Sequence, residues 1–157
     1  MVYQSSSSEN TKKFGAILAA KILNHGVAEK HATILALEGD LGAGKTTFTQ
    51  GFFKGLGIKR APNSPTFILM RRIAMPRKKS DASGFKNIYH VDAYRIREAK
   101  DMKSLGFEDL LTDPQNLFLI EWPVNIASIL PKKKMVIKFS HGKTPESRSI
   151  TIKVISR

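Results

Sequence analysis

The chain has 157 residues, 41% of them hydrophobic and 25% charged, which fits one globular domain with its own core and excludes a disordered or fibrous chain. It contains no cysteine, which excludes disulfides, a thiolate nucleophile and a cysteine zinc site, and fits a reducing compartment. Lys and Arg number 26 against 13 Asp and Glu, and the resulting net charge of +13 predicts either attraction to polyanions or a solvated basic face.

The first predicted elements are a tail and a helix. Residues 1–8 are polar and end in four serines, so we expect a flexible tail whose Ser8 caps the helix, followed by a single domain over residues 9–157. Apolar residues then recur every three or four positions up to Ile22, with Gly26 just beyond, which predicts an amphipathic helix packed on a sheet. The apolar stretch at 14–20 is too short to span a bilayer and no signal-peptide cleavage site follows, so we expect a cytoplasmic protein without membrane contact.

A strand, a glycine-rich loop and a helix are predicted next. Residues 33–37 form a short apolar run, a glycine-rich turn follows at once, and residues 45–56 favour a helix. Two further strands are predicted at 66–73 and 87–94, joined by a flexible and basic hairpin loop over residues 76–86.

The last third of the chain predicts further helices and strands. A short helix containing Gly106 is expected over residues 98–111, and the continuous apolar run at 117–120 is typical of a parallel strand buried on both faces. A helix over 124–130 is expected to precede a hairpin of two alternating strands, 135–139 and 149–155. The order of elements predicts an α/β fold with a covered sheet.

The strongest functional signal is the phosphate-binding pattern GxxxxGK[ST] over residues 39–46, placed between the predicted strand and helix. Glycines let successive backbone N–H groups point at one anion, and the helix adds the positive end of its dipole. We expect this loop to bind a nucleoside triphosphate; the alternative is a glycine-rich turn with a chance lysine. The residues expected to hold the phosphates and a Mg²⁺ ion are Gly42, Ala43, Gly44, Lys45 and Thr46, with Thr47 reaching the α-phosphate.

Two carboxylates are candidates for the chemistry. Glu121 directly follows the predicted buried strand at 117–120, where a Mg²⁺ shell is normally completed; the alternative is an ordinary surface glutamate. Asp92 shares one side of a predicted strand with His90 and would orient the attacking water or a metal-bound water. His90 is better interpreted as a structural hydrogen-bonding residue.

Three other features have competing interpretations. Thr66, in the segment after the phosphate-loop helix, is either a switch that senses the γ-phosphate or part of a Ser-Pro turn. Trp122 either closes the site or meets a partner, and the competing role is core packing. Basic runs either contact nucleic-acid phosphates or form solvated turns, and no RNA-binding signature accompanies them; they lie at residues 71–72, 77–79 and 132–134.

In this order and spacing, five motifs resemble the TsaE family. They are GDLGAGKTTF at 39–48, NSPTF at 63–67, YHVDAYR at 89–95, LGFEDLL at 105–111 and LIEWP at 119–123. The family is the small ATPase of the bacterial pathway that installs threonylcarbamoyl on the adenosine next to the anticodon of certain tRNAs. The chain departs from the family in a longer, more basic stretch at 76–86 and in Val124, where a polar residue is usual.

The resemblance implies a three-layer P-loop NTPase-like fold, with a mostly parallel central sheet and antiparallel hairpins. It also implies ATP with Mg²⁺ and action with the TsaB and TsaD proteins, TsaD being the subunit that transfers the threonylcarbamoyl group while ATP hydrolysis resets the complex. By motif, Lys45 and Thr46 bind phosphate and metal, Glu121 completes the metal site, Asp92 is the catalytic carboxylate and Thr66 belongs to the switch.

The resemblance further places Thr11 near the nucleotide base. Contact with tRNA would be indirect or through the basic surface. Two other classes of function stay open from the residues: a small-molecule kinase that uses the same loop, and a non-catalytic nucleic-acid-binding module.

Overall fold

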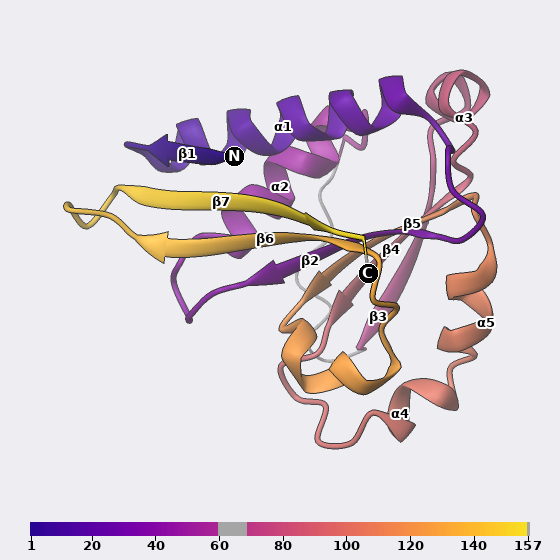
Figure 1. The fold of residues 1–157 in the computed structure, drawn as a ribbon. Helices are drawn as coiled ribbons and strands as arrows, with labels where there is room; N and C mark the ends of the chain where they lie inside the picture. Colours follow the sequence, from indigo (N-terminus) through magenta and orange to yellow (C-terminus); the bar gives the residue numbers. More distant parts are fainter. Residues whose placement is uncertain (60–68, 157) are drawn as a thin grey trace.

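The computed structural model describes residues 1–59 and 69–156, and in this part of the chain seven strands form one mixed sheet (Figure 1). The strand order is β1-β7-β6-β2-β5-β4-β3. The strands are β1 (Val2–Ser5), β2 (Thr33–Glu38), β3 (Met70–Ala74), β4 (Asn87–Asp92), β5 (Asn116–Glu121), β6 (Lys134–His141) and β7 (Arg148–Ile155).

The parallel pairings lie in the centre of the sheet. Strand β2 runs parallel to β5 and β6, and β5 runs parallel to β4. The outer pairs β1–β7, β6–β7 and β3–β4 are antiparallel. The described pairings divide equally between the two kinds, so the sheet is mixed: its central strands are parallel, as expected, and antiparallel pairs flank them. Both predicted central strands are confirmed, and both are buried on their two faces, as parallel strands require.

The first residues are ordered, contrary to the expected loose tail. Residues 2–5 form β1 on the outer side of β7, and the backbone N–H of Ile152 donates to the carbonyl of Met1 at 2.8 Å. The ring of Tyr3 stacks on that of Phe14 with 4.2 Å between centroids. Pairing with β1 supplies hydrogen-bond partners to backbone N–H and C=O groups that β7 would otherwise leave unpaired at the sheet edge. The partly buried ring of Tyr3 adds an apolar contact.

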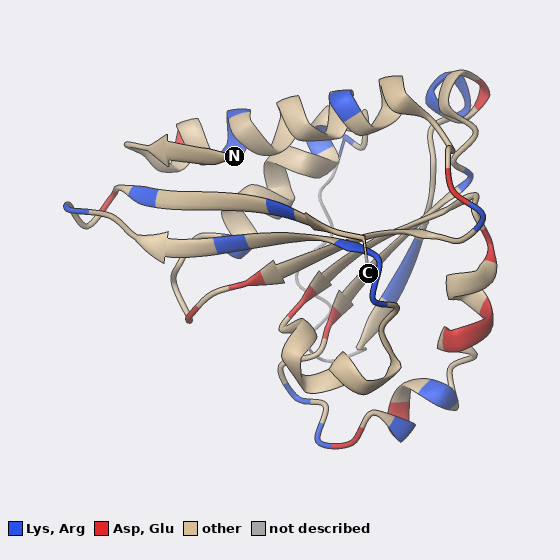
Figure 2. Ribbon diagram, in the orientation of Figure 1, with Lys and Arg blue, Asp and Glu red and all other residues tan. Residues whose placement is uncertain are grey.

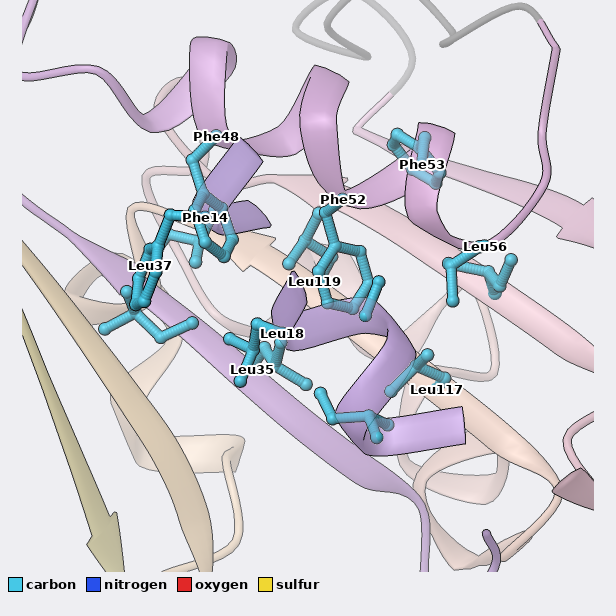
Figure 3. Close-up of a cluster of buried hydrophobic side chains, with 14 of the residues drawn as sticks. Phe14, Leu18, Leu35, Leu37, Phe48, Phe52, Phe53, Leu56, Leu117 and Leu119 are labelled. Atoms are coloured by element: carbon cyan, nitrogen blue, oxygen red, sulfur yellow. The ribbon is translucent and has the colours of Figure 1, made fainter. Parts of the chain in front are cut away.

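Helices α1 (Ser8–His25) and α2 (Lys45–Gly55) cover one face of the sheet. Ser7, rather than the expected Ser8, caps α1 by accepting from the N–H of Asn10 at 3.1 Å. Among the described residues, no helix is both long and apolar enough to cross a membrane. Figure 3 shows part of the core under these helices, and the labelled side chains are Phe14, Leu18, Leu35, Leu37, Phe48, Phe52, Phe53, Leu56, Leu117 and Leu119.

The two helices touch through glycines. A Cβ on Gly51 of α2 would lie 2.0 Å from the carbonyl oxygen of Lys12, and a Cβ on Gly15 of α1 would lie 2.4 Å from that of Phe48. A side chain at either position would clash with the facing backbone. Because glycine has none, the two helix backbones can pack directly against each other. This close approach holds α1 on α2 as well as on the sheet, where the sequence predicted only the sheet.

The opposite face of the sheet is covered by three short helices, so the described part has the expected three layers. They are α4 (Lys100–Lys103), α5 (Phe107–Thr112) and the 3-10 helix η1 (Pro123–Ile129). Phe107 and Met102 pack into a second core with Phe118 of β5. The single helix predicted over 98–111 is wrong, because Gly106 adopts a left-handed conformation (φ 67°) that ends one turn and starts the next.

The segment between β3 and β4 is also more regular than expected. In place of a flexible hairpin loop, residues 77–83 form helix α3 (Arg77–Ser83), which ends at Gly84 with φ 81°. Its Ser83 is buried and accepts, through its carbonyl, from the N–H of Val27 at 2.9 Å. This contact holds α3 beside the segment that follows α1. The polar sequence of α3 gave no indication of the contact.

Candidate functional site

The predicted phosphate loop joins the end of β2 to the start of α2. Gly39, Gly42 and Gly44 have φ angles of 145°, 76° and 104°, which residues with a side chain rarely adopt. Gly44 caps α2 without a side-chain hydrogen bond, so the first N–H groups of the helix remain open to an anion. The glycine spacing therefore builds a phosphate cradle.

Lys45, the first residue of α2, points back over this loop. Its Nζ donates to the carbonyl oxygens of Gly39 and of Asp40, the latter at 2.9 Å, and lies 4.0 Å from the ring centroid of Trp122. Burial lowers the pKa of Lys45 by removing water from the ammonium, while Glu121, Asp40 and Asp92 act in the opposite direction. The site thus holds a desolvated cation in reach of an incoming anion.

A cavity of about 370 Å³ opens beside the loop. It brings together side chains from the loop, α2 and the ends of β4 and β5, which meet at one edge because these strands are parallel to β2 or to each other. The residues that line it are Leu41, Gly42, Gly44, Lys45, Thr46, Thr47, Asp92, Tyr94, Glu121 and Trp122.

The two candidate carboxylates lie opposite each other at the ends of β4 and β5, where Asp92 pairs in register with Glu121. Both are buried. Oε1 of Glu121 contacts His90 Nε2 at 3.0 Å and accepts from Thr49 Oγ1 at 3.5 Å. Oδ1 of Asp92 accepts from the backbone N–H of Tyr94 at 3.0 Å. These contacts fix the direction of both carboxylates before any ligand binds.

His90 therefore acts on Glu121, as a structural hydrogen-bonding residue. Its ring is 1% exposed and packs edge-on against Phe53, with centroids 5.5 Å apart. Its Nδ1, at the other side of the ring, has no hydrogen-bond partner among the described residues.

Trp122 forms the rim of the cavity in a strained backbone conformation. Its φ of 57° is left-handed, which is uncommon for a bulky residue and turns the ring away from the strand direction toward Lys45. Tyr94 meets it with ring centroids 5.1 Å apart and is half exposed. Trp122 lines the cavity and also packs, partly buried, against the second core, so each of the two interpretations describes part of its position.

The oxygen groups in the cavity fit a magnesium nucleotide. Mg²⁺ prefers oxygen ligands and keeps several waters, and the cavity presents the Thr46 hydroxyl with the carboxylates of Glu121 and Asp92. No group of three or more His, Cys, Asp or Glu residues able to hold a metal occurs in the described ranges. Phosphate oxygens and water would therefore have to complete the coordination.

Two predicted site residues lie outside the cavity lining, and a third is not described. Ala43 is a buried residue of the loop itself and does not line the cavity. Thr11 is 1% exposed and bonds through Oγ1 to the hydroxyl of Ser5 at 2.8 Å, so its side chain braces β1 against α1. Thr66 falls outside the described residues.

Arg148 is a site neighbour that the sequence did not reveal. From the start of β7 its Nη2 donates to the carbonyl of Gly42 at 3.2 Å, and its Nη1 donates to the carbonyls of Pro145 and Ser147 at 2.6 and 2.7 Å. This side chain ties the β6–β7 turn to the phosphate loop. Since Arg148 is remote in sequence from the loop, no local pattern could have indicated the contact.

Comparison with known proteins agrees with this geometry. Residues 5–150 match the family model described as "Threonylcarbamoyl adenosine biosynthesis protein TsaE". The tRNA threonylcarbamoyladenosine biosynthesis protein TsaE of Bacillus subtilis is 36% identical over 94% of this chain and 81% of its own length. That of Treponema pallidum is 30% identical over 85% and 86% of the two chains. The crystal structure of B. subtilis YdiB superposes with a TM-score of 0.70 at 29% identity, covering 99% of this chain and 86% of the other.

Proposed function

The chain belongs to the TsaE family of tRNA threonylcarbamoyladenosine biosynthesis, and from this premise we propose that it binds ATP with Mg²⁺ and hydrolyses it. The observation that carries the proposal is the convergence of Lys45, Asp92 and Glu121 on one cavity beside the phosphate loop. The N–H groups at the start of α2 and the Lys45 ammonium supply the positive charge that a triphosphate needs.

Lys45 and Trp122 prepare the site for the nucleotide. The ammonium is held by loop carbonyls and by the indole ring, and we infer that it exchanges these contacts for β- and γ-phosphate oxygens when ATP binds. Because Lys45 is desolvated beforehand, the new contact does not require the ammonium to lose water at that moment. Trp122 then lies beside the phosphates and shields them from solvent.

The metal ion would be held by Thr46 and Glu121, and when bound it neutralises charge on the phosphates. Glu121 keeps its orientation through His90 and Thr49. This is an outer-shell arrangement of the kind that fixes carboxylate ligands in metal sites. The remaining coordination positions would belong to phosphate oxygens and water.

Asp92 is proposed to orient the water that attacks the γ-phosphorus. In this step the water oxygen forms a bond to phosphorus, the bond to the β–γ bridging oxygen breaks, and the products are ADP and inorganic phosphate. Catalysis of this kind consists largely of positioning and charge stabilisation, and no arginine is among the described residues that line the cavity to stabilise the transferred phosphoryl group. We therefore expect slow hydrolysis by the isolated chain.

The missing catalytic contribution is expected from partners. We propose that the chain acts in the cytoplasm with TsaB and TsaD, and that hydrolysis supports or resets threonylcarbamoyl transfer to tRNA. The exposed apolar side chains at the cavity mouth, Leu41 at 78% and Tyr94 at 52% exposure, are consistent with a partner covering the site.

The test is release of phosphate from Mg-ATP by the purified chain, measured with and without equimolar TsaB and TsaD from the same source. Negligible turnover alone and a clear rise with the pair support the proposal. The Glu121→Gln variant keeps an acceptor for His90 but removes the charge, so it should bind nucleotide with a weaker Mg²⁺ requirement and lose turnover. Unchanged turnover on adding the pair would contradict the role with partners, and full activity of Glu121→Gln would contradict the metal assignment.

A further inference from the structure

A second and larger hollow lies between α1 and α2, away from the phosphate loop. Its volume is about 870 Å³ against about 370 Å³ for the nucleotide cavity, and the two share no lining residue. The charged side chains that line it are Lys12, Lys13, Lys54, Lys59 and Glu9. We call it the lysine groove.

The fold itself forces these lysines together. Gly51 and Gly55 of α2 have no room for a Cβ, which would lie 2.0 Å from the carbonyl oxygen of Lys12 and 2.6 Å from that of Ala16. The backbones of the two helices therefore meet, and lysines from α1 line the same groove as Lys54 of α2. Figure 2 shows the Lys and Arg positions along α1 in blue. Gly51 and Gly55 also belong to the lining of the groove.

The charges in the groove are not neutralised by the protein. Four lysines stand against one glutamate, and in the part of the chain that the structure describes none of the four makes an ion pair or a side-chain hydrogen bond. Lys133, outside the groove, pairs with Glu29 at 2.6 Å. Like charges on adjacent helix faces repel one another, and an external anion bound in the groove would relieve that repulsion.

The lining favours nucleic-acid phosphate over an acidic protein. Protein interfaces are enriched in Trp, Tyr, Phe and Arg and depleted in Lys, whereas phosphate contacts use lysine as a point charge. The groove has lysines, peptide groups and the small apolar residues Ala16 and Ile58, with no aromatic or arginine residue in its described lining. Because the described lining has no aromatic ring and no guanidinium group, it cannot stack on bases or form bidentate hydrogen bonds to base edges.

We propose that the lysine groove binds the sugar–phosphate backbone of RNA without reading its sequence. The inference rests on the proposed function only in taking tRNA as the natural RNA. The proposal places RNA on the α1–α2 face. The sequence had instead indicated the basic runs at 71–72, 77–79 and 132–134 as nucleic-acid contacts. Both sites use α2, whose first residues line the nucleotide cavity while Gln50 and Lys54 line the groove.

The test measures binding of a labelled uridine homopolymer and of an unmodified tRNA transcript by fluorescence anisotropy over a series of salt concentrations. Lys13→Gln/Lys54→Gln removes two charges from the groove, and both side chains are exposed, so folding should be preserved. The matched control Lys132→Gln/Lys153→Gln removes the same charge from exposed positions outside the groove. Thermal melting checks that both variants fold.

Each lost phosphate contact lowers the salt slope by about 0.7 to 0.9. The groove variant should therefore lose roughly 1.4 to 1.8 in slope, equivalent to a loss of about 25- to 60-fold in affinity at 0.1 M salt when binding at 1 M is unchanged. The control variant should bind like the parent chain, and an adenosine homopolymer should bind as well as the uridine one.

Equal losses in the groove and control variants would overturn the proposal, because binding would then follow net charge alone. Parent-like RNA binding by the groove variant would also overturn it. Failure to bind RNA, together with groove-dependent binding of polyglutamate, would assign the groove to an acidic protein. Lys45→Met alters only the nucleotide site and should keep full RNA binding. Failure of the ATPase assay would therefore not contradict the RNA proposal, and failure of RNA binding would not contradict the ATPase proposal.

Discussion

Replacement of Lys45 by Met should separate nucleotide binding from folding. A hydrogen bond to a charged group is worth about 1.5 to 3 kcal/mol, so loss of the ammonium should weaken Mg-ATP binding by roughly 10- to 150-fold. The lost bonds to the carbonyls of Gly39 and Asp40 should cost about 1 kcal/mol each, but Met no longer has to bury a charge. We therefore expect the free energy of unfolding without ligand to change by no more than about 1 kcal/mol.

The same variant tests the lowered pKa. Because the pKa of Lys45 in the folded chain lies below its ordinary value of 10.5, the unfolded chain binds more protons between the two values. The stability of the parent relative to Lys45→Met should therefore rise as pH increases through the folded pKa toward 10.5. Isothermal calorimetry with Mg-ATP and urea unfolding at neutral and alkaline pH measure the two effects. Parent-like affinity in the variant would refute the phosphate assignment, and a stability difference independent of pH would refute the argument from desolvation.

Three further substitutions test other parts of the structure. Asp92→Asn should keep nucleotide affinity and lower partner-stimulated turnover by about 10²- to 10⁴-fold, measured by phosphate release; parent-like turnover would reduce Asp92 to a structural role. Gly51→Ala places a Cβ 2.0 Å from the carbonyl oxygen of Lys12, so the helices must separate and urea unfolding should show a loss of roughly 3 kcal/mol, against less than about 0.5 kcal/mol for the exposed neighbour Gln50→Ala. Equal effects of these two would contradict the close helix contact. Arg148→Ala removes the bond to the phosphate loop and should weaken Mg-ATP binding about fivefold by calorimetry, and unchanged affinity would show that the loop holds its shape unaided.

The glycine loop between β2 and α2 was predictable because its determinants are adjacent in sequence. Glycine spacing, the lysine that follows and the flanking strand and helix are all local, and local geometry follows from local sequence. Glu121 was also placed correctly at a strand end, since continuous apolar runs are typical of buried parallel strands. The strand predicted over 87–94 ends at Asp92, beside Glu121, because parallel strands end at one edge. A single rule of sheet topology thus connected residues from three separate segments.

Helix boundaries and the N-terminal segment were predicted less well, because polar segments are ordered by what they contact. The tail pairs as β1 since β7 offers an open edge, and α3 forms because its Ser83 meets the end of α1. The predicted helix over 98–111 divides at Gly106, whose φ of 67° is permitted by glycine but not required by it. Local propensity is weak at such positions, and tertiary contacts decide.

The sequence by itself determined the chemistry of this protein: a phosphate loop, two carboxylates and an excess of positive charge. Only the tertiary structure decided what surrounds that chemistry. It placed Arg148 against the loop, His90 against Glu121, and the lysines of two helices around one groove. The physical reason is that packing between distant segments of the chain determines these contacts. A local sequence pattern does not indicate which distant segments will pack together.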